Sequence, residues 1–207
     1  MIDDKIDIQS AYKELAENYL EPLKDDLLVY LKEWLKGVQR LDRIDARVKT
    51  VSSFVNKALK QDDSGAFKYS KPFSEIQDMI GARVVVFFEQ DAAELIERAK
   101  SEFRYIERKF LVPEYDDAFG YFGYHMICFL PNQGDISAND RVPAYFELQI
   151  KTLFQHAWSQ LHHDTGYKER PDSPFLSKDK RLSAHASSLA WGADKAFAEL
   201  YERSFAD

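Results

Sequence analysis

The sequence predicts an α+β domain with a mixed sheet of roughly five strands, flanked by N-terminal and C-terminal helices. Apolar runs of strand length recur along the middle of the chain, and segments with helical spacing stand between and around them. With 207 residues, of which 45% are hydrophobic and 14% aromatic, the chain is long enough for one domain with a full core. We therefore expect a single domain over residues 1–207, with its core at about 43–170.

One predicted strand in the second half of the chain carries polar residues on a single face. Successive side chains of a strand alternate in direction, so Glu147, Gln149 and Lys151 share one side, and apolar residues occupy the other. Thr152, with Gln155 three residues later, fits a capping box, after which the apolar spacing becomes helical. The strand could thus form the floor of a site. By pattern alone, an edge strand with a solvated polar face is the simpler interpretation.

The remaining elements follow from helical spacing, apolar runs and turn residues. An amphipathic stripe predicts N-terminal helices at 8–38, in which Pro22 either starts a second helix or kinks the first. Ser74 with Gln77 gives a second capping-box pattern, which predicts a short helix that Gly81 ends. The other predicted helices are at 44–59, 91–100 and 178–205. The predicted strands are at 83–88 and at 103–110, and a further strand ends at residue 130.

Composition excludes several classes of protein. No apolar run reaches the roughly 18 residues of a membrane helix and the N-terminus lacks a signal-peptide core, so we expect a cytoplasmic protein without membrane contact. Cys128 is the only cysteine, which excludes an internal disulfide, and its apolar neighbours favour a buried structural thiol. The net charge of −7 disfavours a nucleic-acid binder that works by covering phosphates.

Charge is unevenly distributed, however. The window 40–71 holds eight basic and four acidic residues, a local charge of +4 within an acidic chain. Such a patch suits a small polyanion such as a nucleotide, although an ordinary solvated helix explains it equally well. Asp78, at the head of a buried strand, and Glu147 are oxygen ligands of the kind that hold Mg²⁺ together with substrate phosphates. Together these features predict an enzyme that acts on nucleotides.

Four segments together carry a resemblance that none of them carries alone. Ordered along the chain, they are Arg47-Val48-Lys49 with Ser53 and Lys57, then Asp78 to Arg83, then Gly120 to His125, and Glu147 to Thr152 followed by residues 155–158 and 167–168. In this order and spacing they resemble the motifs of the synthetase domain of the RelA/SpoT family, the (p)ppGpp synthetases. The resemblance covers roughly residues 43–168.

The resemblance implies a stand-alone small alarmone synthetase, or GTP pyrophosphokinase, with a nucleotidyltransferase-like sheet and no hydrolase domain. Family members transfer the β,γ-pyrophosphate of ATP to the ribose 3′-hydroxyl of GDP or GTP. By analogy, Asp78 and Glu147 would be the catalytic carboxylates and would hold Mg²⁺, with Glu147 as second ligand or as base. The implied ATP-binding residues are Arg47, Lys49, Ser53, Lys57 and Arg83. The implied acceptor-binding residues are Tyr121, which would stack on guanine, and His125, Gln149, Lys151 and His156.

Departures from the family pattern leave the acceptor open. Gly123 stands where the family has a serine, and Lys151 stands where it has an arginine, which keeps the charge but loses a bidentate fork. Some compact relatives are toxins that modify tRNA 3′ ends or adenine nucleotides and can have an antitoxin partner. Lys178, Lys180 and Arg181 keep a tRNA acceptor open. A non-catalytic nucleotide-binding module is a further alternative. The apolar stripes of both terminal helices fit a homo-oligomer interface as well as packing on the sheet.

Overall fold

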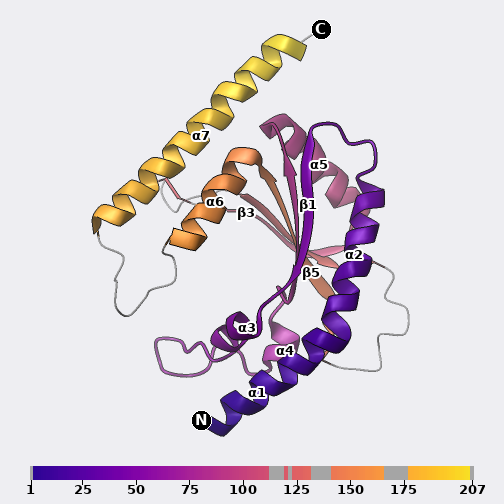
Figure 1. Ribbon diagram of the computed structural model, residues 1–207, viewed down its shortest axis with the longest axis vertical. Helices are drawn as coiled ribbons and strands as arrows, with labels where there is room; N and C mark the ends of the chain where they lie inside the picture. The colour runs from indigo at the N-terminus through magenta and orange to yellow at the C-terminus, as the bar shows by residue number, and fades with distance from the viewer. Residues whose placement is uncertain (1, 112–118, 121–122, 132–140, 166–176, 206–207) are drawn as a thin grey trace.

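A five-stranded mixed sheet forms the centre of the molecule in the computed structural model, which describes residues 2–111, 119–120, 123–131, 141–165 and 177–205. The strands are β1 (Leu41–Val48), β2 (Ile80–Val86), β3 (Tyr105–Leu111), β4 (Gly123–Phe129) and β5 (Tyr145–Thr152). Their order across the sheet is β1-β2-β5-β4-β3 (Figure 1). β2 and β5 run parallel, and the other neighbours are antiparallel. The predicted fold class is confirmed.

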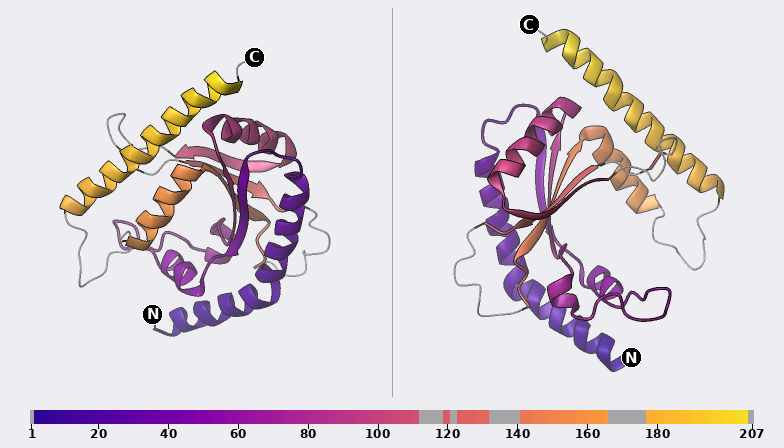
Figure 2. Two further views of the ribbon diagram at one scale, coloured as in Figure 1. Left: turned by 45° about the horizontal axis from the view of Figure 1, so that its top comes forward. Right: turned by 180° about the vertical axis from the view of Figure 1, so that it is seen from behind.

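Helices flank the sheet and extend beyond it (Figure 2). They are α1 (Ile2–Leu15), the π-helical turn η1 (Ala16–Leu20), α2 (Glu21–Trp34), α3 (Val51–Ala58), α4 (Pro72–Glu75), α5 (Glu89–Glu102), α6 (Leu153–Thr165) and α7 (Ser177–Phe205). Pro22 lies in the first turn of α2, directly after the π-helical turn; because Leu15, Leu20 and Glu21 all have right-handed helical angles, the helical backbone runs on from α1 into α2. None of these described helices has the length and apolar character needed to cross a bilayer.

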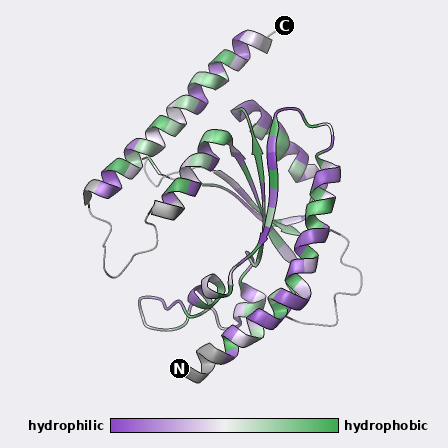
Figure 3. Ribbon diagram, in the orientation of Figure 1, coloured by the Kyte–Doolittle hydropathy of each residue, from purple (hydrophilic) through white to green (hydrophobic). Residues whose placement is uncertain are grey.

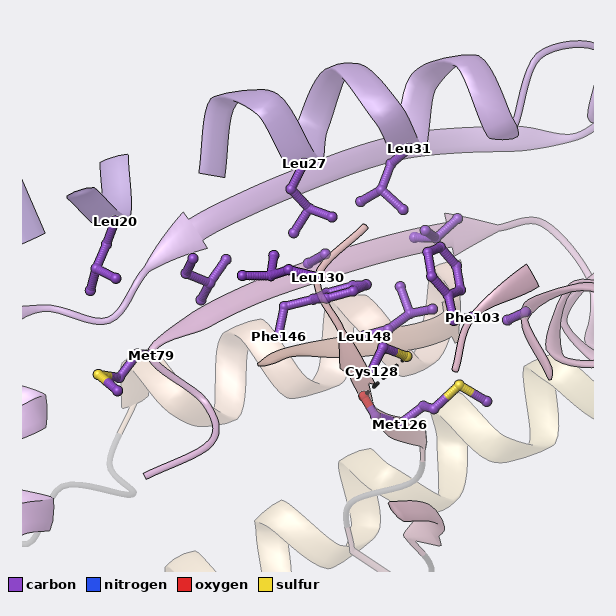
Figure 4. Packing of buried hydrophobic residues seen from close by; sticks show 14 of the residues in the cluster. Leu20, Leu27, Leu31, Met79, Phe103, Met126, Cys128, Leu130, Phe146 and Leu148 are labelled. Carbon is purple, nitrogen blue, oxygen red and sulfur yellow. Dashed lines mark hydrogen bonds between the residues drawn. The ribbon is translucent and has the colours of Figure 1, made fainter. Parts of the chain in front are cut away.

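The hydrophobic core lies between the apolar face of the sheet and helices α2 and α5 (Figure 4). Leu148 of β5 packs in the same cluster as Leu27 and Leu31 of α2, and all three are almost completely buried. Each such side chain stabilises the fold by about 1.5–3 kcal/mol. Cys128 is buried in this core, and burial raises the pKa of its thiol to about 12, which confirms a structural thiol. In Figure 3, α2 and α7 show the banded colouring of amphipathic helices.

Helix α1 contacts the chain just after the end of β1. The ring of Tyr12 stacks on Phe54 of α3 with centroids 3.8 Å apart. Its hydroxyl donates to the backbone carbonyl of Lys49 at 2.8 Å, and the N–H of Lys49 donates to the carbonyl of Met79 at 2.8 Å. The residue after β1 is therefore held by both α1 and the chain that enters β2.

The helix predicted over 44–59 is wrong in its first half. Residues up to Val48 form β1, which pairs antiparallel with β2, and only Val51–Ala58 is helical. The prediction failed because Ile44, Val48, Val51 and Val55 also fit helical spacing. Hydrogen bonding to β2 selected the strand. The basic residues at 47 and 49 consequently do not lie on a helix.

The helix predicted from Ser74 to Gly81 is also wrong. Glu75 accepts hydrogen bonds from the backbone N–H of Lys71 at 3.0 Å and the hydroxyl of Ser70 at 2.9 Å, so the chain caps earlier, and α4 ends at Glu75. Gly81 lies inside β2, so Arg83 stands in the middle of that strand and not at its first position, where the strand predicted at 83–88 placed it.

The interpretation of residues 145–152 as an edge strand is wrong as well, because β5 is the central strand of the five. The prediction of a strand with a polar face followed by a capped helix is confirmed. The N–H of Thr152 donates to Oε1 of Gln155 at 3.2 Å, and the N–H of Gln155 donates to Oγ1 of Thr152 at 3.2 Å. This reciprocal pair is the predicted capping box, and it starts α6 immediately after β5.

Candidate active site

One face of the sheet collects the polar residues, and strand pairing arranges them in rows. Arg47 of β1 lies opposite Gly81 of β2, which in turn lies opposite Glu147 of β5. Directly opposed residues of neighbouring strands project from the same face of a sheet, so each row is a line of neighbours. The second row consists of Asp45, Arg83, Gln149 and His125, one from each of four adjacent strands.

Asp78 lies just before β2 and is held by two lysines. Nζ of Lys49 donates to Oδ2 of Asp78 at 2.7 Å, and Nζ of Lys57, in the last turn of α3, lies 3.0 Å from Oδ1. Oδ1 is buried and accepts no well-directed hydrogen bond from the described residues, although Lys57 pairs with it as an ion. Burial raises the pKa of Asp78, but the hydrogen bond and charge of Lys49, with the charge of Lys57, lower it below its usual value. The carboxylate is therefore ionised at neutral pH.

Glu147 has a separate pair of partners. Nδ1 of His125 lies 2.8 Å from Oε1, and Nε2 of Gln149 donates to Oε2 at 2.7 Å. Burial raises the pKa of Glu147, but the hydrogen bond and charge of His125, together with the bond from Gln149, bring it below its usual value. Glu147 is thus an oriented, ionised carboxylate on the polar face.

The two carboxylates lie at the same end of the sheet. Asp78 stands three residues before Gly81, and Gly81 is the register partner of Glu147 in the adjacent parallel strand. The negative charge of Asp78 also acts to raise the pKa of Glu147. Strand order β2-β5 therefore brings together two acids that lie far apart in the sequence.

A buried lysine and a histidine occupy the side of the site next to α6. Lys151 is only 2% exposed, and its Nζ donates to Oγ of Ser159 at 3.2 Å. Burial, followed by the charge of Arg83, lowers the pKa of Lys151 to about 7, while Glu147 opposes that shift. His156 of α6 lies 3.4 Å from a guanidinium nitrogen of Arg83, and burial and the nearby positive charges lower its pKa.

The arginines line a pocket beside this face. The pocket encloses about 250 Å³, and its walls include Arg47, Gly81, Arg83 and Gln149 from the strands and Gln160 from α6. The side chain of Arg47 lies over Gly81, where a Cβ atom would stand 3.9 Å from it. A planar guanidinium above an open stretch of backbone is suited to contact with a flat ring.

Most of the predicted site residues are brought together, and two need comment. Ser53 lies in the first turn of α3, where it accepts a hydrogen bond from the hydroxyl of Thr50 at 2.8 Å, on the same helix as Lys57. Tyr121 lies outside the described residues, as do the matched positions 167–168.

Three residues of the site were not predicted from the sequence. Asp45 and Gln160 line the arginine pocket, and Ser159 is the partner of Lys151. Asp45 could have been found by recognising β1 as a strand, because it stands two residues before Arg47 and so shares its face. Nothing in the sequence marks Ser159 or Gln160, which depend on how α6 sits against the sheet.

The donor set limits the kind of metal that the site could hold. Within the described part of the chain, no group of three or more His, Cys, Asp and Glu side chains gathers as a metal site. Asp78 and Glu147 supply two carboxylates, and Oδ1 of Asp78 is a buried oxygen that lies 3.0 Å from the ammonium group of Lys57. Two carboxylates without a complete protein cage match a cation whose remaining ligands are water and substrate phosphates, which is the usual coordination of Mg²⁺.

Comparison with known proteins places the chain in a family. Residues 46–172, more than half of the chain, match the family model described as the region found in RelA / SpoT proteins. The chain belongs to the RelA/SpoT family. Among relatives of this RelA/SpoT protein, the GTP pyrophosphokinase YjbM of Bacillus subtilis (strain 168) is 28% identical over 199 residues, covering 89% of this chain and 87% of the relative. The GTP pyrophosphokinase YwaC of the same organism is 24% identical over 198 residues, covering 86% and 91%.

Solved structures of similar proteins support the same fold. Small alarmone synthetase 1 from Bacillus subtilis gives a TM-score of 0.75 at 22% identity, covering 96% of this RelA/SpoT chain and all of that one. A GTP pyrophosphokinase family protein from Streptococcus pneumoniae gives 0.73 at 21% identity, with 93% and 94% coverage. A structure of the Bacillus synthetase bound to its product pppGpp gives 0.69 at 23% identity, with 94% and 98% coverage.

Proposed function

We propose that this chain transfers the β,γ-pyrophosphate of ATP to the 3′-hydroxyl of GDP or GTP and thereby makes (p)ppGpp. The observation that carries the proposal is that Asp78 and Glu147 lie at the same end of the sheet, each ionised and held by its own partners. The names of the relatives support this reaction, as do related structures bound to pppGpp and to the ATP analogue AMPCPP. Both nucleotides are cytoplasmic metabolites, which supports a cytoplasmic location.

The reaction forms one bond to phosphorus and breaks another. The 3′ oxygen of the acceptor attacks the β phosphorus of ATP, the bond from that phosphorus to the oxygen bridging the α phosphorus breaks, and AMP leaves. The proton of the 3′-hydroxyl needs an acceptor, and Glu147 is the ionised carboxylate that we assign to this role. Because His125 and Gln149 each engage one of its oxygens, Glu147 keeps a fixed orientation toward the acceptor.

We expect Mg²⁺ to bind Asp78, with Glu147 as a second carboxylate ligand. The fit rests on the two-carboxylate donor set and on Oδ1 of Asp78, which accepts no well-directed hydrogen bond from the described residues. When bound, Mg²⁺ neutralises charge on the transferring phosphates. Lys49 and Lys57 flank Asp78, and we assign their ammonium groups to the oxygens of the triphosphate.

The two nucleotides are assigned to opposite sides of these carboxylates. Arg47 and Arg83 line the pocket and are assigned to the adenine of ATP, because a guanidinium stacks well on flat rings. Ser53 and the two lysines belong to the phosphate side. His125, Gln149, Lys151 and His156, which lie toward β4 and α6, are assigned to the acceptor together with Tyr121.

One experiment tests the reaction and separates it from the alternatives. Purified protein is incubated with Mg²⁺ and ATP labelled at the β or γ phosphate, together with GDP, GTP, AMP or bulk tRNA, and the labelled products are resolved by chromatography. Transfer to GDP or GTP is the expected result, and the Glu147→Gln variant serves as the blank. Transfer confined to tRNA or AMP would replace the proposed acceptor with that of the toxin-type relatives. Binding of ATP without any turnover would support a non-catalytic module.

The homo-oligomer predicted through the terminal helices remains a prediction. Tyr12, Leu27 and Leu31 from the N-terminal stripe are buried within the chain itself. On α7, by contrast, Leu182 and Leu189 are more than half exposed. Sedimentation velocity on the wild type, compared with a Leu182→Ser, Leu189→Ser double variant, tests whether α7 forms the interface.

A further inference from the structure

A second pocket, of about 210 Å³, lies at the other end of the sheet from Asp78 and Glu147. Its walls come from the first turn of α5, from α6 and α7, and from Phe110 of β3. Residue Thr152, which ends β5, donates a hydrogen bond to the pocket residue Asp194 at 2.8 Å, so the pocket adjoins the carboxyl end of β5. Neither the proposed reaction nor any predicted site residue uses it.

The pocket contains a buried carboxyl group with one oxygen available. Asp194 of α7 is only 3% exposed, and its Oδ2 accepts the hydrogen bond from Thr152. Its Oδ1 accepts no hydrogen bond from any residue in the described part of the chain, and Asp194 lines the cavity. Within the described residues, Oδ1 is not among the fully buried side-chain atoms that lack a hydrogen-bond partner, so it reaches the cavity, where a bound donor can pair with it.

The other charges of the pocket already balance each other. Nζ of Lys195 lies 2.9 and 3.1 Å from the two carboxylate oxygens of Glu89, which makes an ion pair at the rim. Asp194 is therefore the source of any net charge in this cavity. The electron-rich indole rings of Trp158 and Trp191 also line the pocket; Trp158 stacks on His162, and Nζ of Lys195 lies 5.8 Å from the centre of the Trp191 ring.

We propose that this pocket binds a planar organic cation of the amidinium or guanidinium class. Two parallel N–H groups on such a cation would face the carboxylate of Asp194, the geometry that makes such pairs strong. The plane of the cation would lie against the indole walls, where a cation is attracted to the ring face. The cavity is smaller than the roughly 300–1,000 Å³ of a drug-sized site, so it suits a fragment and not a whole nucleotide. The ionised carboxylate of Asp194 would repel a phosphate group, because the charges of Glu89 and Lys195 balance each other.

Binding of a cation at this position depends on the protonation of Asp194. Burial raises the pKa of its carboxyl to about 7. The hydrogen bond from Thr152 acts to lower this pKa, the negative charge of Glu89 acts to raise it, and the positive charge of Lys195 acts to lower it. The groups that α6 and β3 present to the pocket are uncharged. A cation pairs with the ionised form, so affinity rises as the pH increases through about 7 and levels off above that value.

Benzamidine is the first probe, and tryptophan fluorescence is the first measurement. Two of the three tryptophans, Trp158 and Trp191, line the pocket, so a bound ring changes their emission. We expect a saturable change with benzamidine and binding at least about tenfold weaker with benzamide, its uncharged analogue of the same shape. Equal binding of the two compounds, or no saturable response to benzamidine, would overturn the proposal.

Variants locate the binding and control for misfolding. Asp194→Asn keeps an acceptor oxygen for Thr152 but loses the charge, and we expect benzamidine affinity to fall at least about tenfold. Ala190→Leu fills the cavity without touching that hydrogen bond and should also abolish binding. Glu199→Gln, an exposed carboxylate on the same helix, is the matched control and should bind normally. Unchanged affinity in both pocket variants, with native circular dichroism, contradicts the assignment.

Two further probes distinguish the source of the cation. Agmatine presents a guanidinium as a free small molecule, and glycyl-arginyl-glycine presents it as a protein side chain. Tighter binding of agmatine supports a metabolite as the occupant, and tighter binding of the peptide supports an arginine of a protein partner. If neither agmatine nor the peptide binds, guanidinium ligands are excluded and the proposal is overturned for them.

Discussion

Nδ1 of His125 lies 2.8 Å from Oε1 of Glu147, although the two residues stand 22 positions apart in the chain. Antiparallel pairing of β4 with β5 brings them onto the same face, and Gln149 engages the second oxygen at 2.7 Å. The carboxylate is held at both oxygens, so its plane is set before any substrate arrives. The same contact also determines how readily Glu147 takes up a proton.

Replacing Glu147 with Gln should lower the rate of pyrophosphate transfer by roughly 10²–10⁴-fold, the usual contribution of a positioned acid–base group. The amide has nearly the same shape as the carboxylate but cannot take the proton. The labelled-ATP assay measures the rate, and a thermal melt checks the fold. Glu107→Gln, an exposed glutamate of β3, is the matched control and should keep wild-type activity. A wild-type rate from Glu147→Gln would remove it from the mechanism.

Replacing His125 with Ala should move the acid limb of the pH–rate profile to higher pH. Without His125, burial still raises the pKa of Glu147, while the largest opposing influence is gone, so the carboxylate takes up a proton at a less acidic pH. The profile of kcat/KM for GDP against pH provides the measurement. Lys109→Ala, which alters the exposed partner of His125 on β3, should leave the limb in place. An acid limb that does not move in His125→Ala contradicts the coupling.

We expect the activity of the wild type to fall at alkaline pH, and Lys151→Arg should remove this fall. Burial, with the charge of Arg83, lowers the pKa of Lys151 to about 7, so the free protein loses this positive charge as the pH rises above that value. If Lys151 attracts acceptor phosphates, kcat/KM for GDP falls over the same range. Arginine stays protonated throughout, so the variant should hold its kcat/KM there. Identical alkaline limbs in the two proteins would show that Lys151 does not act through its charge.

Asp78→Asn should reduce transfer by roughly 10²–10³-fold, the cost of losing a preorganised electrostatic contact. The change removes the carboxylate that balances Lys49 and Lys57 and that we assign to Mg²⁺. Titration with Mg²⁺ at fixed ATP measures the apparent metal affinity, which should weaken in the variant. Asp26→Asn, on the exposed side of α2, is the matched control. An unchanged Mg²⁺ requirement would argue against Asp78 as the metal ligand.

Asp194→Asn should stabilise the protein near and above neutral pH. An aspartate in the unfolded chain loses its proton near pH 3.8, whereas burial in the folded protein raises the pKa of Asp194 to about 7. Between these values the folded state binds more protons than the unfolded state, so its stability falls as the pH rises, and asparagine lacks this loss. Thermal melts from about pH 4 to 8 should show the variant gaining at least about 2–4 °C over the wild type, the shift that 1 kcal/mol gives in a chain of this size.

The same melts provide the opposing outcome. The Tm difference between Asp194→Asn and the wild type should be smallest at acid pH and should stop growing above about pH 7. Glu199→Gln, exposed on the same helix, should follow the wild type throughout. A Tm difference that is constant with pH would mean that Asp194 does not retain its proton in the folded state.

Much of the fold could be predicted from local patterns. The alternation at Glu147, Gln149 and Lys151 gave the strand and its polar face, and the Thr152–Gln155 pair gave the start of α6 through a capping box that is present in the structure. These predictions succeeded because strand alternation and helix capping depend on residues close together in the chain.

The errors arose where a local pattern was ambiguous or a distant partner decided the outcome. Ile44, Val48 and Val55 suit both a helix and a strand followed by a helix, and only the neighbouring strand β2 selects the second. Ser74 and Gln77 fit a capping box in the sequence, but Glu75 bonds to Ser70 and Lys71, and the short helix α4 begins before Ser74.

The order of residues along this chain was enough to indicate an α+β domain, the residue types of the site and the resemblance that the family match confirms. Which side chains touch was decided only by the tertiary structure. Asp78 and Glu147 lie at the same end of the sheet because β2 and β5 are neighbours, and Asp194 meets Thr152 because α7 folds back along α6. Such contacts join residues separated by tens of positions, and the packing that creates them depends on the whole core, which no short pattern encodes.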